Sequence, residues 1–305
     1  MSRSPATPYD VNGRTVFITG AARGIGAAAA ERLHRKGANV ALVGLEPERL
    51  QALAERLGPD RTMCFEADVT DYQALERAVE ATVERFGGID VGIANAGLQF
   101  NGALATAPIE QVERILAVNF LGVWRTDRAL IGQIIERRGY LLNISSLSAI
   151  TRGPMLGAYT ATKAGVEALS DCLRSETYPS GARVGCAYFG FLDTDLVRAA
   201  FADPAIETTI AQMPGFIRRP APLSKAIDAL ERGIERRSAR LWAPRWVGPM
   251  LLLRGALQPL LERSIQGSPD LAEAVRLADP NAARPGGRSI GDQDLQLGVA
   301  AQALE

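Results

Sequence analysis

Short apolar runs alternate with longer segments of helical periodicity along most of the chain, and this alternation limits the possible folds more than any other feature. The helices predicted between the first runs span 24–36, 46–57 and 71–86. Strands that alternate with helices favour a parallel sheet covered on both faces. We therefore expect a doubly wound α/β sheet in three layers, α/β/α. The predicted strands span 15–19, 39–43, 62–66, 89–94, 140–144, 183–188 and 240–243.

The composition excludes several classes of protein. The chain of 305 residues is 47% hydrophobic, enough for a large core, and its formal net charge is zero. A neutral surface argues against nucleic acid as a partner, because binding to phosphates requires basic residues. The three cysteines are far apart and there is one histidine, so we expect no metal site. That residue, His34, is expected to face solvent on a helix, which disfavours a Ser-His-Asp triad.

The chain is predicted to form one domain, 12–245, between a flexible polar lead, 1–11, and a C-terminal extension, 246–305. The lead has no apolar signal region and the cysteine count is odd, so a cytoplasmic location is expected. Residues 246–265 are strongly apolar and helical in pattern, but charges and prolines interrupt them, which disfavours a membrane span. This segment could pack on the domain or a second subunit, cover the active site, or lie on a membrane surface; packing is favoured. The composition of 280–292 is typical of disorder.

The sequence TGAARGIG, residues 19–26, joins the first predicted strand to the first predicted helix. Its glycines, Gly20, Gly24 and Gly26, permit positive φ angles and a close approach of the backbone to a ligand. A strand, a glycine-rich turn and a helix N-terminus together form a site for a pyrophosphate. The spacing differs from the usual G-x-G-x-x-G, and a tight turn without a ligand would leave the same pattern.

The sequence YTATK, residues 159–163, places a phenol and an ammonium group four positions apart. On a helix, Tyr159 and Lys163 would lie on the same face. A lysine cation beside the phenol would favour the phenolate and lower the pKa of Tyr159. The pattern is short, and taken alone it also fits two surface residues of an ordinary helix.

Further residues between these two motifs complete a series, namely Asp68, Asn95, Ala96, Gly97, Asn119 and Ser146. In this order and spacing the motifs resemble the short-chain dehydrogenase/reductase family, of the TGxxxGxG and YxxxK type. Ser146 lies 13 residues before Tyr159, and this spacing selects it over Ser145 as the counterpart of the family's catalytic serine. The resemblance covers about residues 12–245 and implies a Rossmann-like fold with nicotinamide-dependent oxidoreduction.

The resemblance implies an enzyme that interconverts a secondary alcohol and a ketone with NAD or NADP. Tyr159 would be the general acid in reduction and the general base in oxidation. Lys163 would lower the pKa of that phenol and hold the nicotinamide ribose. Ser146 would donate a hydrogen bond to the substrate oxygen, and Asn119 would hold a water between Lys163 and solvent. Alternatively, Asn119 could cap or kink its helix, and Ser146 could be a turn residue at a strand end.

The implied cofactor-binding residues follow the first, second, third, fourth and sixth strands or lie on the catalytic helix: Gly20, Arg23, Gly24, Ile25, Gly26, Gly44, Leu45, Asp68, Val69, Asn95, Ala96, Gly97, Tyr159, Lys163, Gly190 and Thr194. Asp68 would contact the adenine, although it could instead cap the helix near Asp71. Gly44 stands where an acidic residue would hold the ribose of NAD, and Glu46 follows two residues later. Arg23 could bind a 2′-phosphate, so NAD and NADP both stay open, with a lean to NADP.

The sequence departs from the family after the sixth strand, where Phe189 takes the place of the usual proline before Gly190. Apolar residues in 193–219 fit a lid over a hydrophobic substrate, but equally fit ordinary helix packing. We expect an apolar alcohol or ketone, resembling a lipid, terpenoid or steroid. The predicted pocket residues are Ser148, Leu156, Phe189, Phe191 and Leu196.

The family resemblance also implies a homodimer or homotetramer. Two other functions use the same residues and stay open at this point. One is a regulator or scaffold that binds the cofactor without catalysis. The other is an epimerase or dehydratase built on the same fold.

Overall fold

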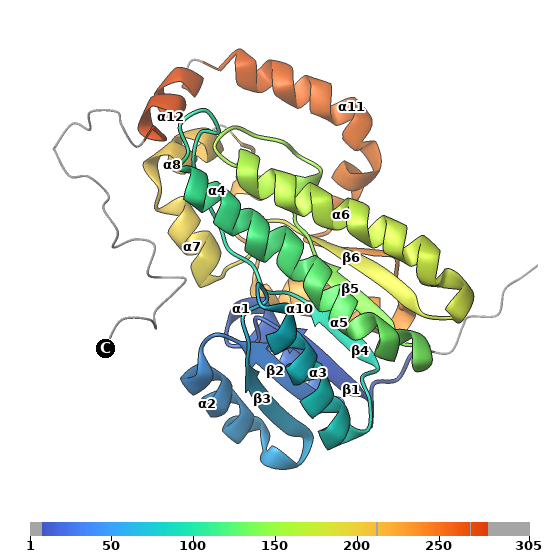
Figure 1. Cartoon of the computed structure of the whole chain (residues 1–305). Coiled ribbons are helices and arrows are strands. Elements are labelled where there is room, and N and C mark those ends of the chain that lie inside the picture. Colours follow the sequence, from blue (N-terminus) through green and yellow to red (C-terminus); the bar gives the residue numbers. More distant parts are fainter. Residues whose placement is uncertain (1–7, 212, 269, 280–305) are drawn as a thin grey trace, which may run out of the picture.

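The computed structural model describes residues 8–211, 213–268 and 270–279, and within them the chain forms one seven-stranded sheet between helices (Figure 1). All neighbouring strands are parallel, in the order β3-β2-β1-β4-β5-β6-β7. The predicted doubly wound, three-layer fold is therefore confirmed. The strands are β1 (Thr15–Thr19), β2 (Asn39–Gly44), β3 (Thr62–Glu66), β4 (Val91–Ala94), β5 (Tyr140–Ile144), β6 (Arg183–Phe189) and β7 (Arg240–Ala243).

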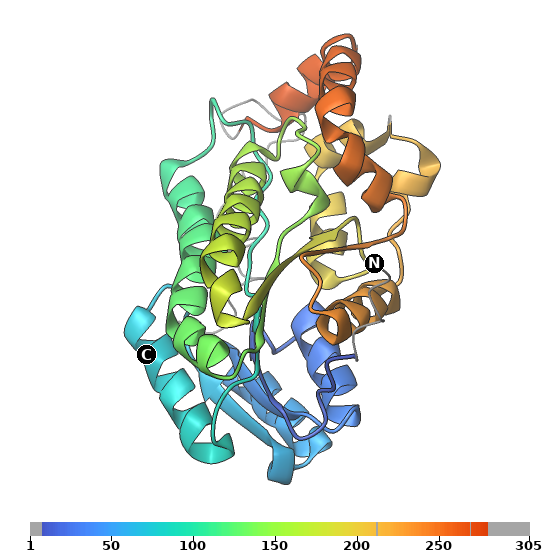
Figure 2. The ribbon, with the colours of Figure 1, turned by 90° about the vertical axis from the view of Figure 1, so that its right-hand side faces the viewer.

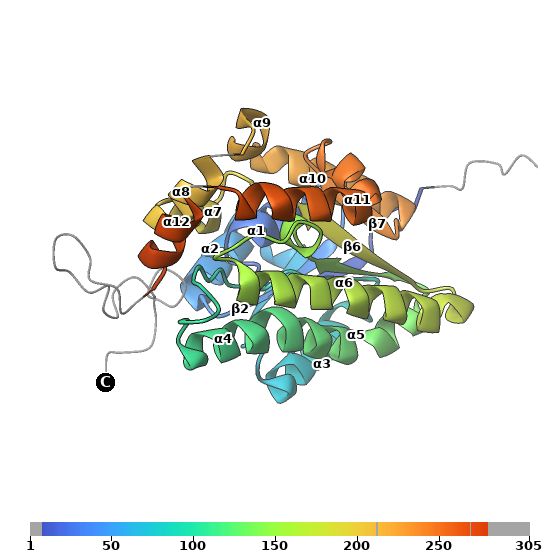
Figure 3. The same cartoon turned by 90° about the horizontal axis from the view of Figure 1, so that it is seen from above.

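Two helix layers enclose the sheet, as the view from above shows (Figure 3). Val16 and Ile18 of β1 pack into one core cluster, while Phe17, between them, packs into the other. Successive side chains of a strand point to opposite faces, so a sheet covered on both sides favours apolar residues at most positions of its strands. One layer contains α1 (Gly24–Arg35), α2 (Pro47–Leu57) and α10 (Leu223–Arg236), and the other α3 (Tyr72–Phe86), α5 (Gly122–Glu136) and α6 (Gly157–Thr177).

The order of the strands reverses at β1, since β2 and β3 lie on one side of it and β4 to β7 on the other. At such a point the loops beyond the carboxyl ends of the strands diverge and leave a crevice for a ligand. Asn95, which follows β4, crosses this point by donating from Nδ2 to Thr19 O at 3.0 Å and to Gly20 O at 3.1 Å. Further short helices follow later strands: α4 (Ile109–Leu116), α7 (Asp195–Phe201), α8 (Pro204–Ala211) and α9 (Gly215–Arg218).

The C-terminal extension forms α11 (Val247–Gln266) and α12 (Leu271–Leu277), which lie at one end of the molecule (Figure 2). Val247 and Leu251 are buried against Leu147 and Ile150, and Ala274 of α12 joins a cluster with α8. The described part of the extension therefore packs on its own domain. Among the described residues, no helix is long and apolar enough to cross a membrane. The stretch 280–292, for which the composition indicated disorder, lies outside the described residues.

The N-terminal lead and His34 show two differences from the sequence-based expectations. Residues 1–7 of the lead lie outside the described residues, but Tyr9 N donates to Glu235 O at 2.7 Å and Val11 is buried. The expectation that His34 faces solvent was wrong, because its exposed fraction is only 9%. Arg61 binds the carbonyl oxygen of His34 at the end of α1, and burial lowers the pKa of the imidazole.

A buried carboxyl group joins the helix layer to β5. Asp127 of α5 is 2% exposed and accepts a hydrogen bond at Oδ2 from Asn143 Nδ2 at 2.8 Å. The other side-chain oxygens of Asp127 and Asn143 are buried without a partner. Burial raises the pKa of Asp127 to about 8. A neutral carboxylic acid suits this place, because it removes a buried charge and supplies a hydrogen where two acceptors lack a donor.

This carboxyl predicts that the free energy of unfolding falls as pH rises from about 4 to about 8. The folded protein keeps a proton up to about pH 8, whereas the unfolded chain releases it near the ordinary value of 3.8. The loss approaches about 1.4 kcal/mol per pH unit within that window. Asp127→Asn should remove this dependence, and urea unfolding at several pH values measures it. Asp60→Asn, at an exposed carboxyl, is the matched control, and parallel curves for the wild type and Asp127→Asn would contradict the assignment.

Candidate active site

The turn between β1 and α1 is tightly packed and contains two residues with positive φ, Gly20 at 65° and Gly24 at 56°. A Cβ added to Gly20 would lie 2.8 Å from Ala96 Cα, and one added to Gly26 would lie 2.2 Å from Gly20 O. Arg23, the residue before α1, does not cap the helix with its side chain. The first backbone N–H groups of α1 therefore receive no hydrogen-bond acceptor from this side chain. The turn can therefore bring backbone donors close to an anion.

Thr19 and Asn95 fix this turn against the end of β4. Thr19 Oγ1 accepts hydrogen bonds from Asn95 N at 3.1 Å and Ala96 N at 3.3 Å. Together with the bonds of the Asn95 amide to Thr19 O and Gly20 O, these bonds set the separation of the two loops. The residues after β1 and β4 thus form one rigid wall of the crevice.

Ser146, Tyr159 and Lys163 are brought together by the end of β5 and the first turns of α6. The side chain of Ser146 lies close enough to the phenol of Tyr159 to lower its pKa. Lys163 Nζ lies 5.7 Å from the centroid of the Tyr159 ring and donates to Ile144 O at 2.9 Å. The hydroxyl of Ser145 instead donates to Lys163 O at 2.9 Å. Of the two serines, Ser146 is the one whose side chain affects the pKa of the phenol, while Ser145 joins β5 to α6.

Asn119 lies in the π-helical segment η2 (Ala117–Leu121), which joins α4 to α5. It is fully buried, and its side chain binds both backbone groups of Leu98, N at 2.6 Å and O at 2.8 Å. A Cβ added to Gly97 would lie 3.3 Å from Asn119 Oδ1 and 3.6 Å from Lys163 Nζ. Gly97 therefore leaves space beside the ammonium group. Asn119 Nδ2 also donates to Thr162 Oγ1 of α6 at 3.5 Å, so its side chain joins the loop after β4 to α6 and does not cap a helix.

The charge states of the two central residues are set mainly by burial. Tyr159 keeps part of its surface accessible, yet desolvation raises the pKa of the phenol, and only the side chain of Ser146 lowers it. Burial also lowers the pKa of Lys163 to about 8. The expectation that Lys163 lowers the pKa of the phenol is thus not met in the protein without its cofactor. Desolvation is the largest influence on the pKa of both groups. Tyr159 is a neutral phenol at pH 7, the form that can donate a proton.

The end of β2 carries an ion-pair cluster. Glu46 pairs with Arg23 Nε at 3.1 Å and with Arg49 Nε at 3.2 Å, so two guanidinium groups hold one carboxylate. Gly44 is buried, and Leu45, whose side chain is 47% exposed, points outward. The structure therefore brings Arg23 and Glu46 together, although they come from different loops.

The loop after β3 holds Asp68 and Val69. Asp68 Oδ1 accepts from Thr70 N at 2.8 Å, while Asp71 is the residue that caps α3, by accepting from Ala74 N at 3.1 Å. The alternative in which Asp68 caps this helix is therefore wrong. Val69 is buried against α5, where a Cβ on Gly122 would lie 2.6 Å from Val69 Cγ2.

The residues predicted for the substrate side are dispersed over several environments. Leu156 and Phe191 border a cluster that also contains Met155 and residues of α8, and Phe191 packs edge-on against Phe201 at 4.9 Å. Phe189 is only 5% exposed in the main core, whereas Leu196 is 40% exposed.

The remaining residues after β6 and β5 form local bonds. Gly190 N donates to Ala243 O at 2.9 Å, and Thr194 caps α7 by accepting from Val197 N at 3.3 Å. Ser148 N donates to Ser146 Oγ at 3.1 Å. Ser148 is thus the predicted pocket residue with a direct bond to the candidate catalytic serine.

Comparison with known proteins decides the family. The model of the short chain dehydrogenase family matches residues 14–205. The chain belongs to that family. A 3beta-hydroxysteroid dehydrogenase 1 of Eggerthella lenta is 30% identical to it over 226 residues, or 71% of this chain and 86% of that protein. A glycine betaine reductase of Emericella nidulans is 34% identical over 197 residues, or 64% of this chain but only 16% of that longer protein.

A solved structure of a dehydrogenase/reductase agrees with this fold. A dehydrogenase/reductase from Sinorhizobium meliloti 1021 superposes with a TM-score of 0.67 at 27% identity, covering 76% of this chain and 94% of the other. The chain is thus an oxidoreductase of the short chain dehydrogenase family, whose enzymes use NAD or NADP and act on small molecules. The predicted family and enzyme class are confirmed.

The site of this short chain dehydrogenase fits a nicotinamide dinucleotide. At Gly20 and Gly26, where the pyrophosphate is expected, the backbone is packed so closely that a Cβ atom would not fit. Gly97 leaves room beside Lys163. Three contributors were not singled out from the sequence: Thr19, which fixes the loop after β4, Ser145 as the tie to α6, and Arg49. In the sequence, only the position of Thr19 at the start of the glycine motif could have indicated its role. Within the described ranges, no group of three or more His, Cys, Asp or Glu side chains could hold a metal ion.

Proposed function

We propose that the protein interconverts a secondary alcohol and a ketone. The observation that carries this proposal is the grouping of Ser146 after β5 with Tyr159 and Lys163 on α6, where Lys163 Nζ lies 5.7 Å from the centroid of the Tyr159 ring. When bound, the nicotinamide cofactor supplies or accepts the hydride. Residues expected to hold it are the glycine turn for the pyrophosphate, Asp68 and Val69 for the adenine, Lys163 for the ribose, and Gly190 with Thr194 for the carboxamide.

The residues of the chain would manage the proton and the charge on the substrate oxygen. In reduction, Tyr159 donates its phenolic proton to the carbonyl oxygen, and in oxidation it removes the proton of the alcohol. Ser146 donates a hydrogen bond to the same oxygen as negative charge develops there. Lys163 stabilises the phenolate that remains after donation. Asn119 stays the candidate for holding a water that links Lys163 to solvent.

An apolar substrate is supported by the side chains near the catalytic loop. Leu156 and Phe191 are partly buried in a cluster of apolar residues that includes Phe201 and Met213. The relative from Eggerthella lenta is named for a hydroxysteroid. We therefore propose a steroid-, terpenoid- or lipid-like alcohol or ketone as the substrate class, bound between the catalytic loop and helices α7 and α8.

The test is a panel assay. Purified protein is mixed with NADPH or NADH and apolar ketones, and with NADP or NAD and the matching alcohols, and absorbance of the reduced nicotinamide is followed. Turnover of apolar compounds is expected. Turnover only of small polar hydroxy acids would overturn the substrate class. Product formation without a net change in the nicotinamide would favour an epimerase or dehydratase, and cofactor binding without any turnover would favour a regulator.

We also propose that NADP is preferred and that Arg23 reads its 2′-phosphate. Arg23→Ala is expected to lower kcat/KM for NADP by about 10-fold or more, because a bond between charged groups is lost. The value for NAD should change much less. Arg56→Ala, which removes an exposed arginine paired with Glu31, is the matched control. Equal losses with both cofactors would contradict the role of Arg23.

A homodimer or homotetramer is proposed, supported by an apolar stripe on α4, η2 and α5. Ile109, Leu116, Leu121 and Trp124 are 69%, 36%, 39% and 47% exposed. Trp124→Glu is expected to convert the assembly to monomers, because a charge would be buried in the interface. Light scattering measures the mass, and Leu252→Glu, at a residue 79% exposed on α11, is the control. An unchanged mass for Trp124→Glu would exclude this stripe.

The cysteines support a cytoplasmic location. Cys64, Cys172 and Cys186 are all free, and no disulfide forms between them. Proteins that keep thiols reduced are typical of the cytosol. Fractionation of the source cells would test this part of the proposal.

A further inference from the structure

We propose that α11 braces the loop between Ser146 and Tyr159, with Arg254 and Gln258 as positioning residues for the reaction. This inference rests on the function proposed above. The helix lies at Val247–Gln266, outside the residues 14–205 that match the family model. It touches the catalytic scaffold in three places, and none of its contacts reaches a reacting group.

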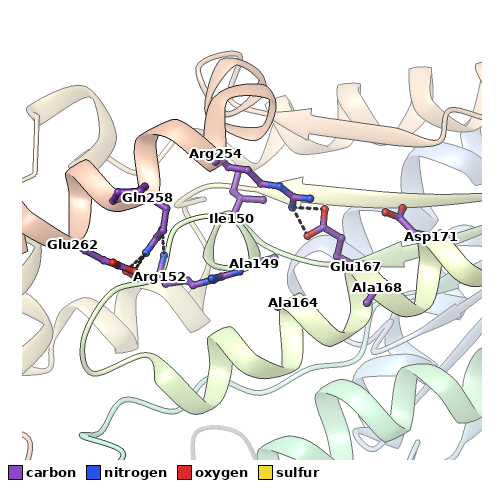
Figure 4. Close-up of a pocket in the computed structure, with 12 residues that line it drawn as sticks. Ala149, Ile150, Arg152, Ala164, Glu167, Ala168, Asp171, Arg254, Gln258 and Glu262 are labelled. Carbon is purple, nitrogen blue, oxygen red and sulfur yellow. Dashed lines mark hydrogen bonds and ion pairs between the residues drawn. The ribbon is translucent and has the colours of Figure 1, made fainter.

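The first contact is a two-point bond between a side-chain amide and a loop backbone. Arg152 N donates to Gln258 Oε1 at 3.2 Å, and Gln258 Nε2 donates to Arg152 O at 3.5 Å (Figure 4). Arg152 lies about midway between Ser146 and Tyr159 in the chain. The amide of Gln258 therefore satisfies both backbone groups of one residue in the segment that sets the separation of these two side chains.

The second contact is an ion pair to the catalytic helix. Arg254 Nη1 lies 2.7 Å from both carboxylate oxygens of Glu167 (Figure 4). The hydroxyl of Tyr188 donates to the same carboxylate at 2.8 Å. Glu167 is only 7% exposed and follows Lys163 by one turn of α6. Removal of Arg254 would leave this buried carboxylate without its cation, which favours a shift of the helix or entry of water.

The third contact is apolar and lies at the start of α11. Val247 and Leu251 pack with Leu147, the residue that follows Ser146, and with Ile150. Beyond Leu251, α11 and α6 border an open pocket of about 560 Å³. Its lining includes the small residues Ala149, Ala164, Ala168, Gly255 and Pro259. Side chains do not fill this space, so apolar packing does not hold this part of α11 in place. The bonds of Arg254 to α6 and of Gln258 to Arg152 hold it instead.

The brace has a consequence for catalysis. Ser146 and Tyr159 must keep one geometry toward the substrate oxygen, and a displacement of about 1 Å can reduce a rate by about 100-fold. The loop that joins them carries Met155, whose φ of 64° is unusual for a residue other than glycine. A segment in this conformation depends on its surroundings to stay in place. The contacts of α11 with Leu147 and Arg152 help to hold this segment in place.

The test compares Arg254→Ala/Gln258→Ala with Arg263→Ala, an exposed arginine on the same helix. In the double variant, kcat is expected to fall at least 10-fold, while the Kd for the cofactor stays within twofold of the wild type. Arg263→Ala should keep both values. If the double variant does not fold, Gln258→Ala alone is expected to show the same pattern with a smaller loss. An unchanged kcat in a folded variant would overturn the proposal.

Hydrogen exchange tests the brace independently of turnover. The amides of residues 147–152 should exchange at least 10-fold faster in the double variant, while those of β1 and β2 keep their rates. Equal acceleration throughout the protein would show a loss of general stability and overturn the proposal, as would unchanged exchange at 147–152. If the wild type reduces no ketone at all, the proposed function fails, but the exchange result still decides whether α11 holds the loop.

Discussion

Tyr159→Phe is expected to lower kcat by about 10²- to 10⁴-fold, the range typical for loss of a general acid or base. The substitution removes one hydroxyl and keeps the ring. Burial raises the pKa of the phenol and so favours its protonated form at neutral pH. Ser146 and Lys163 would remain in the Tyr159→Phe variant, but neither has the role of proton donor in the proposed mechanism. The loss should therefore appear in kcat for reduction and for oxidation alike.

Cofactor affinity and stability separate this loss from a structural effect. The fluorescence of bound NADPH should give a Kd within a few-fold of the wild type, because the glycine turn is unchanged. The free energy of unfolding should change by less than about 1 kcal/mol, as for removal of one neutral hydrogen bond. Tyr178→Phe is the matched control, since that ring is 61% exposed. Full turnover in Tyr159→Phe would remove the proposed mechanism.

The direction of the pKa shift adds a pH dependence to this prediction. Reduction uses the neutral phenol, which burial favours, so its rate should hold through neutral pH. Oxidation requires the phenolate, so its rate should rise with pH. Lys163, with its pKa lowered to about 8, loses its charge as pH rises through that value. The stabilisation of the phenolate by this ammonium group should weaken in the same interval.

Much of the fold could be predicted because the sheet is buried on both faces. Strands such as β1 and β5 are then mostly apolar runs, and the helices between them have one apolar face, so both patterns are visible in the letters. The motifs also marked the glycine turn and the residues of α6, since local spacing sets which side chains share a helix face. Ser146 could be chosen over Ser145 because its distance from Tyr159 resembles that of the family's catalytic serine.

Features that depend on burial and distant partners could not be predicted in this way. His34 is buried because Arg61 and the core surround the end of α1, which helical periodicity does not reveal. Asp127 has the pattern of an exposed helix residue until Asn143 of β5 is placed beside it. The pKa of Tyr159 depends on the balance between desolvation and charge, and that balance requires coordinates. The hold of α11 on Arg152 joins residues more than 100 positions apart.

Gly26→Ala is expected to weaken cofactor binding at least 10-fold and to destabilise the fold by about 1–3 kcal/mol, as overpacking does. The added methyl would lie 2.2 Å from Gly20 O and 2.8 Å from Asn95 Nδ2. Neither atom can move freely, because the amide of Asn95 bonds Gly20 O and Thr19 O. The turn itself must then shift, and the backbone donors of the proposed pyrophosphate site shift with it.

The same substitution at Gly132 should have the opposite effect on stability. Gly132 lies in α5, and a Cβ there would meet nothing within 4 Å. Gly132→Ala should therefore stabilise the protein by about 0.5–1 kcal/mol, since glycine is a poor helix former. Urea unfolding and titration with NADPH and NADH, made on both variants, compare the two sites directly. If Gly26→Ala binds either cofactor as tightly as Gly132→Ala, close packing at Gly26 does not serve the cofactor, and the pyrophosphate must be sought away from this turn.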